Sequence, residues 1–231
     1  DILGLPKLHV GRTSNVPGGT HPEQMAFREA LVQGDEESCR KALSRQINLG
    51  FTRYEAAEFL ITDAMKGLGL AWVQRDIDAY QERRGCDICI RLINELRSDL
   101  TPPHDDAPVA IGGAPGGDMY QLPTALVELT LREIGWKATS LGANLPADSF
   151  VQACYDYQPA LVWMSVSHVE NVPIFVAEQN RVASSIGEDT PLILGGRAVN
   201  DDVRPRLRYT AFCDSMKQLA ELSSMMRMRI R

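Results

Sequence analysis

The sequence predicts an α/β protein in which a helical bundle precedes a doubly wound parallel sheet. Up to about residue 100, apolar residues recur at the spacing of amphipathic helices, and from about residue 108 short apolar runs alternate with helical segments. Of the 231 residues, 44% are hydrophobic and 23% are charged, which is the composition of a globular chain and excludes a disordered one.

The first hundred residues predict an arm and then four helices. Residues 1–20 are rich in glycine and proline without periodicity, so we expect an irregular arm there. In residues 21–100 we expect helices over about 23–32, 35–50, 52–68 and 79–97, which together make a small antiparallel bundle.

Local signals mark the ends of these helices. Asp35 is placed to cap the second helix, and Thr52 with Glu55 forms a capping box for the third. A break at residues 72–78 precedes the long fourth helix. Its apolar stripe is expected to consist of Cys86, Cys89, Ile90, Ile93 and Leu96.

Residues 101–107 read TPPHDDA, a linker by composition, and residues 108–231 form the second domain. Strands are expected at the apolar runs 109–111, 139–141, 160–165, 192–194 and 209–212. Helices are expected to open at Pro123, at Pro146, near Pro173 and near Ser215. The alternation predicts a flavodoxin- or Rossmann-like sheet of five parallel strands with helices on both faces.

Charge and composition narrow the function classes. The net charge of −6 argues against direct binding of nucleic acid by this chain, because such binding requires Lys and Arg to neutralise phosphates. No run of 18 apolar residues and no signal-peptide pattern occurs, so we expect no membrane contact and a cytoplasmic location. The five cysteines are an odd number and are expected to be reduced. The chain starts at Asp1, which suggests a fragment of something longer.

In an open parallel sheet, ligands bind beyond the carboxyl ends of the strands. The loop after the first expected strand, GGAPGGDMYQLP, matches neither G-x-G-x-x-G nor a P-loop. No nucleophile elbow, paired-carboxylate signature or His-Glu-x-x-His occurs, so we expect no catalytic residues and a protein that is not an enzyme.

Several of these loops together resemble a known family. The stretches GGDMYQLP, REIGWKATSLGANLP, QPALVWMSVS and LILGGRAVN resemble the cobalamin-binding domain of corrinoid proteins. The bundle resembles the helical cap that precedes this domain, and the likeness is greatest to light-dependent transcriptional regulators. Trp72, nine intervening residues, Glu82 and Arg83 are similar to their Trp-x9-Glu-His motif, in which the bundle covers the upper face of the corrin.

The resemblance implies two axial histidines, and both are replaced. The family's Asp-x-His-x-x-Gly motif, whose His coordinates cobalt from below, corresponds to Asp118, Tyr120 and Pro123. Arg83 stands where the upper motif has His, and a guanidinium does not coordinate a metal. The sequence therefore does not identify which residue, if any, would coordinate the metal.

The resemblance also assigns residues to the nucleotide tail of the cofactor. Ser165 matches a serine that faces the buried tail, and Gly195 and Gly196 match a glycine pair that lets the tail pass the backbone. Ser167 and His168, just after the same expected strand, lie where they could reach a ligand. Cobalamin is the cofactor implied, with haem or a linear bilin as alternatives.

Structural roles compete with these assignments. Trp72 could be a core or interdomain aromatic, Asp118 a loop hydrogen bonder or N-cap, and His168 a surface or capping residue. Cys86 and Cys89 form a C-x-x-C that fits buried apolar packing better than a metal site. The Met- and Arg-rich residues 225–231 fit a solvated helix end or an oligomer contact.

Three functions follow as hypotheses. The first is a sensory or regulatory domain that binds a cobalamin or another tetrapyrrole, responds to it or to light, and controls assembly as a homo-oligomer. The second is a corrinoid methyl-carrier subunit, in which cobalt changes oxidation state; that cycle usually needs the histidine that Tyr120 replaces. The third is a pseudo-domain that has lost the cofactor and acts through protein contacts.

Overall fold

The computed structural model describes residues 21–187 and 189–230. The described chain forms two compact units, with the division between Leu100 and Thr101. The arm predicted for residues 1–20 lies outside the described residues. Among the residues described, no helix is both long enough and apolar enough to cross a bilayer.

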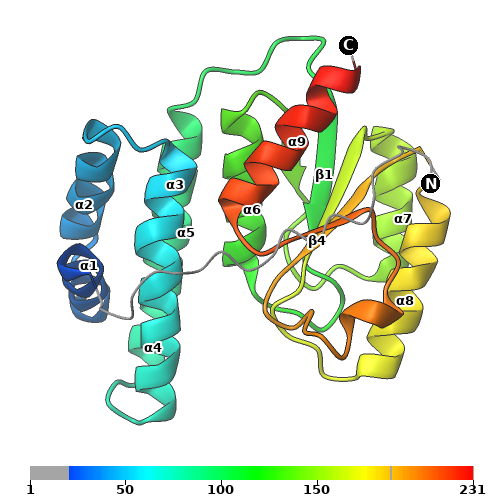
Figure 1. Cartoon of the computed structure of the whole chain (residues 1–231). Helices are drawn as coiled ribbons and strands as arrows, with labels where there is room; N and C mark the ends of the chain where they lie inside the picture. The colour runs from blue at the N-terminus through cyan, green and yellow to red at the C-terminus, as the bar shows by residue number, and fades with distance from the viewer. Residues whose placement is uncertain (1–20, 188, 231) are drawn as a thin grey trace. The chain divides into compact units, whose positions relative to one another are not determined.

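The first unit is the predicted bundle (Figure 1). Its helices are α1 (Pro22–Gln33), α2 (Glu36–Asn48), α3 (Arg53–Ala57), α4 (Asp63–Val73) and α5 (Ala79–Ser98). A π-helical turn at Glu58–Thr62 joins α3 directly to α4, so the predicted third helix continues five residues beyond its expected end, to Val73. The break before α5 is correspondingly shorter.

The predicted helix starts are confirmed. The Asp35 carboxylate accepts from Ser38 N at 3.0 Å, and Thr52 and Glu55 make the reciprocal bonds of a capping box. The predicted stripe of α5 is wrong in part, because Ile88 and Leu92 are buried while Cys86 and Ile90 are only half-buried. The reason is that α5 packs against both α1 and α4, which moves its buried face around the helix.

The second unit is the predicted α/β domain, and its five strands are all parallel. They are β1 (Val109–Gly113), β2 (Lys137–Ser140), β3 (Leu161–Ser165), β4 (Leu192–Gly195) and β5 (Ala211–Cys213). The order across the sheet is β2-β1-β3-β4-β5, which is the flavodoxin-like order and confirms the fold prediction. The helices α6 (Gln121–Glu133), α7 (Ala147–Tyr157), α8 (Val172–Ser185) and α9 (Met216–Ile230) alternate with the strands, and a short 3₁₀ turn lies at Arg204–Arg206.

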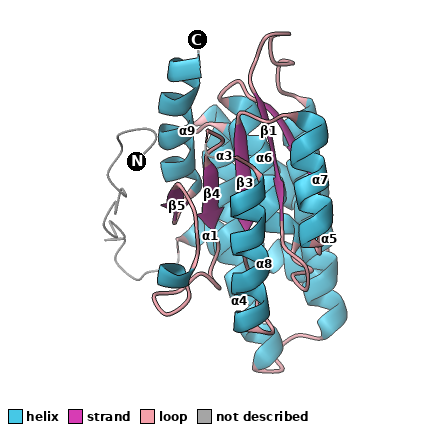
Figure 2. Cartoon of the chain, turned by 90° about the vertical axis from the view of Figure 1, so that its right-hand side faces the viewer, coloured by secondary structure: helices cyan, strands magenta, loops and turns pink. Residues whose placement is uncertain are grey.

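The helices cover the two faces of the sheet in pairs (Figures 1 and 2). Residues of α7 and α8 share one apolar cluster with Ile111, Val162 and Leu194. Residues of α6 and α9 share the other with Ala110, Trp163 and Ile193. Alternate strand residues therefore face opposite layers, and Trp163 and Ser165, two positions apart, lie on the α6/α9 side.

The strand order reverses between β1 and β3. Successive crossovers leave in opposite directions there, so the loops after these strands diverge at the carboxyl edge of the sheet. This is where ligand sites of open α/β sheets form, and it is where Asp118, Tyr120, Ser167 and His168 lie.

Candidate functional site at the carboxyl edge of the sheet

Asp118 organises the loops at the carboxyl edge. Its side chain is fully buried, and its carboxylate accepts three backbone N–H bonds. Oδ1 accepts from Tyr120 at 3.0 Å, and Oδ2 accepts from Ser167 at 2.6 Å and from His168 at 3.1 Å. Asp118 therefore ties the loop after β1 to the loop after β3, which is the loop-bonding role that the sequence left open.

Asn144 brings in the loop after β2. Its backbone N donates to the Asp118 carbonyl at 2.7 Å, and its side-chain oxygen accepts from Gly117 N at 2.8 Å. Asn144 holds a φ of 55°, in the left-handed region that Asn tolerates better than most residues. Three loops are thus fixed to one another before any ligand is considered, a role for Asn144 that the sequence analysis did not find.

Tyr120 and Arg197 form the exposed part of this edge. The Tyr120 side chain is 44% exposed, and the Arg197 guanidinium lies 5.2 Å from the centre of its ring. Arg197 Nε also donates to the Ser167 carbonyl at 3.1 Å, which links the loop after β4 to that after β3. With exposed Met119 and exposed His168, these residues offer an aromatic ring, a thioether, an imidazole and a cation on one sheet edge.

Ser165 and the glycine pair lie at the ends of β3 and β4. Ser165 is buried and pairs with Gly195 across the two strands. Gly196 has a φ of 111°, and a Cβ there would lie 2.2 Å from the Val166 carbonyl oxygen. The close approach of this loop to the end of β3 therefore requires glycine at position 196 without any ligand.

Pro123 lies in the first turn of α6, which begins at Gln121, two residues earlier than predicted. Its ring is half-buried. A proline is tolerated there because the first-turn N–H groups have no partner within the helix. The residue thus has a helix-start role in the structure.

The remaining predicted residues belong to the bundle unit. Trp72 is in the last turn of α4 with half of its surface exposed, and Arg83, in α5, is also exposed. Glu82 is half-buried in the first turn of α5 and accepts a hydrogen bond from Cys86 Sγ at 3.5 Å. The exposure of Trp72 argues against a role in the core of the bundle.

The C-x-x-C of α5 is not poised for thiolate chemistry. Burial, with a contribution from Glu82, raises the pKa of the Cys86 thiol to about 12. Burial also raises the pKa of Cys89 well above its ordinary value. No group of three or more His, Cys, Asp or Glu that could hold a metal ion occurs in the described part of the chain.

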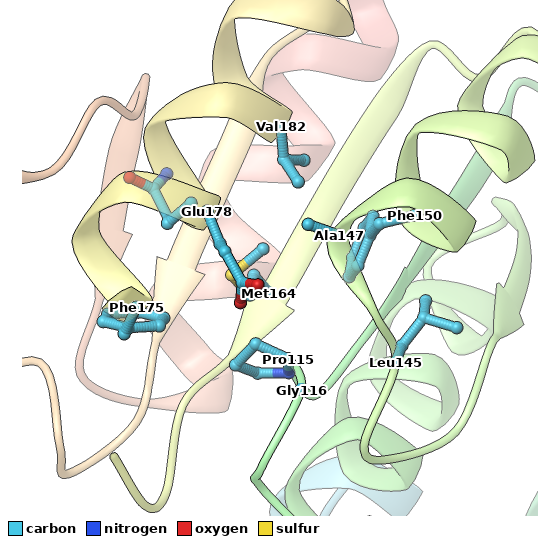
Figure 3. Close-up of a pocket in the computed structure, with 10 residues that line it drawn as sticks. Pro115, Gly116, Leu145, Ala147, Phe150, Met164, Phe175, Glu178 and Val182 are labelled. Carbon is cyan, nitrogen blue, oxygen red and sulfur yellow. The ribbon is translucent and has the colours of Figure 1, made fainter. Parts of the chain in front are cut away.

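Two hollows lie in the described part of the α/β unit, and the smaller one borders the loops after β1 and β2 at Pro115, Gly116 and Leu145. One, of about 10 Å³, lies between α7 and α8 over Met164 and is lined mainly by apolar side chains such as Phe175 and Val182 (Figure 3). It has room for about one water molecule. The other, of about 450 Å³, lies where residues 101–108 pass Arg132 and Arg227.

Trp163 fills the α6/α9 side of the sheet near Ser165. Its indole is 1% exposed, and its Nε1 donates to Thr124 Oγ1 at 3.0 Å. Thr124 Oγ1 in turn lies 3.0 Å from Ser140 Oγ. A Cβ on Gly112 would lie 2.3 Å from Trp163 Cδ2, so the ring occupies the space left by the absent side chain of Gly112.

Comparison with known proteins supports the fold. No family model matches the sequence, and no curated protein matches it. Among solved structures, the monomethylamine corrinoid protein of Methanosarcina barkeri matches with a TM-score of 0.67 and 15% identity, over 86% of this chain and 95% of that chain.

Two further matches have lower scores. A cobalamin-binding protein from Desulfitobacterium hafniense DCB-2 matches over 88% of this chain and 98% of that one, at 16% identity and a TM-score of 0.47. The methanol:cobalamin methyltransferase complex of Methanosarcina barkeri matches over 91% and 81%, at 16% identity and 0.48. The match to the monomethylamine corrinoid protein shows that the chain has the fold of a corrinoid protein.

Proposed function

We propose that this chain is a sensory or regulatory domain that takes a cobalamin or related tetrapyrrole at the carboxyl edge of its sheet. The observation that carries the proposal is the edge itself, where the buried Asp118 carboxylate fixes two loops and leaves Tyr120 and His168 exposed. The fold shared with a corrinoid protein supports the same assignment.

The donor set decides how a corrinoid would be held. Tyr120 replaces the imidazole expected in the loop after β1, and a phenol with a pKa of about 10 is a poor cobalt ligand. We therefore propose that cobalamin retains its own base on the cobalt and contacts this chain through Met119, Tyr120, His168 and Arg197. A bound corrinoid supplies a visible chromophore and a redox-active metal; the chain supplies the surface.

Haem remains an alternative ligand, because a tyrosinate can hold haem iron. Arg197, whose guanidinium lies over the Tyr120 ring, would pair with the carboxylates of haem. The methyl-carrier function is less well supported, since Tyr120 stands where the resemblance implies the lower histidine.

An absorption titration tests the proposal. The full chain is titrated with hydroxocobalamin, haem and biliverdin, and we expect a saturable spectral change with one of them. With cobalamin, electron paramagnetic resonance of the reduced sample should retain the nitrogen splitting of the cofactor's own base. Splitting that is present in the native chain and disappears in His168→Ala would show instead that His168 is the ligand.

Two variants locate the binding surface. Arg197→Gln removes the exposed cation and should weaken binding several-fold, whereas Arg208→Gln removes a cation near β5 and should not. Trp72→Ala should weaken binding or alter the photochemical response while the bundle stays folded, because half of the Trp72 surface is exposed. An unchanged titration in Arg197→Gln would contradict the placement of the ligand at the carboxyl edge.

A cofactor-free regulatory domain is the second candidate. Two residues favour it because their roles need no ligand. The Asp118 carboxylate already accepts three backbone N–H bonds, and position 196 must be glycine because a Cβ there would collide with the Val166 carbonyl. This candidate predicts no spectral change with any of the three ligands, together with self-association of the chain.

A further inference from the structure

The Trp163 indole lies on the side of the sheet that carries Ser165, where it is buried between Gly112 and Thr124. We infer that the Trp163 indole occupies the space in which the nucleotide base of a corrinoid would otherwise be buried, so that Trp163 determines that the base stays outside. The inference deepens the proposed function and rests on it for its meaning, although its first test does not require a corrinoid.

Trp163 lies where a tail that enters beside Ser165 would have to pass. Trp163 and Ser165 project to the same side of β3, the side covered by α6 and α9. A tail that passes Ser165 and Gly195 into this layer would meet the indole, which lies between Gly112 and Thr124. The side chain is 1% exposed, so the indole is enclosed by its neighbours on this side of the sheet.

The indole ring of Trp163 is chemically similar to the nucleotide base of a corrinoid. Indole and dimethylbenzimidazole are both a six-membered ring fused to a five-membered ring that contains nitrogen. The nitrogen of Trp163 donates to Thr124 Oγ1 at 3.0 Å, and that hydroxyl is 3.0 Å from Ser140 Oγ. A hydroxyl can also donate, so the Thr124–Ser140 pair could serve an acceptor nitrogen equally well. The chain thus holds an internal side chain with the fused-ring shape and polarity of the base, although the base carries two more methyl groups.

Removing the indole should create a cavity, and binding of untethered 5,6-dimethylbenzimidazole to that cavity tests the inference. Trp163→Ala removes the ring and leaves an enclosed, mainly apolar space with the Thr124 hydroxyl at its wall, the kind of cavity that takes up small aromatic molecules. We expect 5,6-dimethylbenzimidazole at ten times its Kd to raise the melting temperature of this variant by about 3–6 °C and that of the native chain by nothing measurable.

The variant can also be tested if it fails to fold alone. In that case, refolding with 5,6-dimethylbenzimidazole should restore the native circular dichroism, because a ligand that binds only the folded state shifts the equilibrium toward it. Adding Thr124→Ala to Trp163→Ala should weaken the effect of the base several-fold. No stabilisation and no rescue of Trp163→Ala would overturn the inference.

A second experiment uses intact cobalamin, whose base is tethered to the corrin, and takes Trp136→Ala as the matched control. Trp136 is also fully buried in the α6/α9 layer, but it precedes β2 at the amino edge, beyond reach of a tail that enters beside Ser165. With reduced cobalamin, Trp163→Ala should lose the nitrogen splitting of the base, while the native chain and Trp136→Ala retain it.

The two experiments distinguish failure of the proposed function from failure of the role assigned to Trp163. If free base stabilises Trp163→Ala but cobalamin binds no variant, the proposed function is wrong and the space-filling role of Trp163 stands. If cobalamin binds the native chain and its base is already displaced there, or if Trp136→Ala displaces it equally well, the role assigned to Trp163 is wrong.

Discussion

A single buried carboxylate fixes the geometry of the predicted site. Asp118 bonds the N–H groups of Tyr120, Ser167 and His168, which lie two, 49 and 50 residues away in the sequence. Hydrogen bonds to a charged acceptor out of reach of water are among the stronger ones in proteins. The exposed residues of the edge therefore depend on a residue that does not itself reach the surface.

Asp118→Asn should destabilise the α/β unit. The amide has one acceptor oxygen where the carboxylate has two, so at least one N–H of the edge loops loses its partner at a cost of about 1–3 kcal/mol. Urea unfolding of the full chain measures the loss. Asp202→Asn is the matched control, because Asp202 is an exposed carboxylate near the same edge, and it should change the free energy of unfolding by less than about 0.5 kcal/mol. Equal effects in the two variants would contradict the role of Asp118.

At the scale of elements, the bundle depends on local caps and on charge pairs between α2 and α5. The α3 capping box is formed by neighbours in the sequence, with Thr52 N donating to Glu55 Oε2 at 2.9 Å and Glu55 N donating to Thr52 Oγ1 at 3.3 Å. Arg40 and Arg91 instead join helices, since they bond Glu95 and Glu36 respectively.

Thr52→Ala should lower the free energy of unfolding of the bundle by about 1 kcal/mol, because the first-turn N–H of Glu55 loses its acceptor. Thr52→Ser keeps a hydroxyl at the same position and should recover most of the loss. Thermal unfolding followed at 222 nm compares the two variants. A serine variant as unstable as the alanine variant would assign the effect to the lost methyl group.

The bundle should also lose stability in acid. The Arg91 hydrogen bond lowers the pKa of Glu36 below its ordinary 4.5, and the Arg40 hydrogen bond does the same for Glu95. Because both folded values are depressed, the stabilisation is present above about pH 4.5 and is lost as the pH falls through the lower folded pKa values. Melting temperatures measured from pH 6 downward should fall less in Glu36→Gln/Glu95→Gln than in the native chain. Added salt should reduce the difference, since the pairs are partly exposed.

At the scale of the whole molecule, each unit presents exposed apolar side chains. On α9, Met228 is 70% exposed and Ile230 50%, and on α4, Val73 is 73% exposed and Trp72 50%. Clustered apolar side chains on a surface indicate contacts with another molecule. They support the proposal that the chain self-associates.

Light-scattering mass measurements should therefore show a dimer or larger assembly, and we expect cobalamin or illumination to change its mass. A ligand shifts assembly only by the difference in its affinity for the two states, so the change should saturate with ligand concentration. Met228→Lys should weaken association, while Met25→Lys, at a 49% exposed position on α1, should not. A monomer in the dark and in light, with and without cobalamin, would contradict the sensory function.

Most elements and the fold class could be predicted from the amino-acid sequence, because their signals are local. The capping box of α3 spans four residues, and the alternation of apolar runs with helices is enough to imply parallel strands with helices on both faces. Periodicity was less successful where two partners share one helix, as in α5, and where a π turn carries a helix past its expected end, as in α4. Both outcomes depend on packing between helices.

The roles of the individual site residues depend on contacts between segments that are far apart in the sequence. Nothing near Asp118 in the sequence shows that its carboxylate bonds amides 49 and 50 residues away, nor that Arg197 lies over Tyr120. Trp163 reads as one more apolar residue of a buried strand, and its role appears only when Gly112 and Thr124, from two other elements, are brought against its ring. The physical reason is that hydrogen bonding and close packing act between groups near in space, whereas periodicity reports only which side of its own element a residue faces.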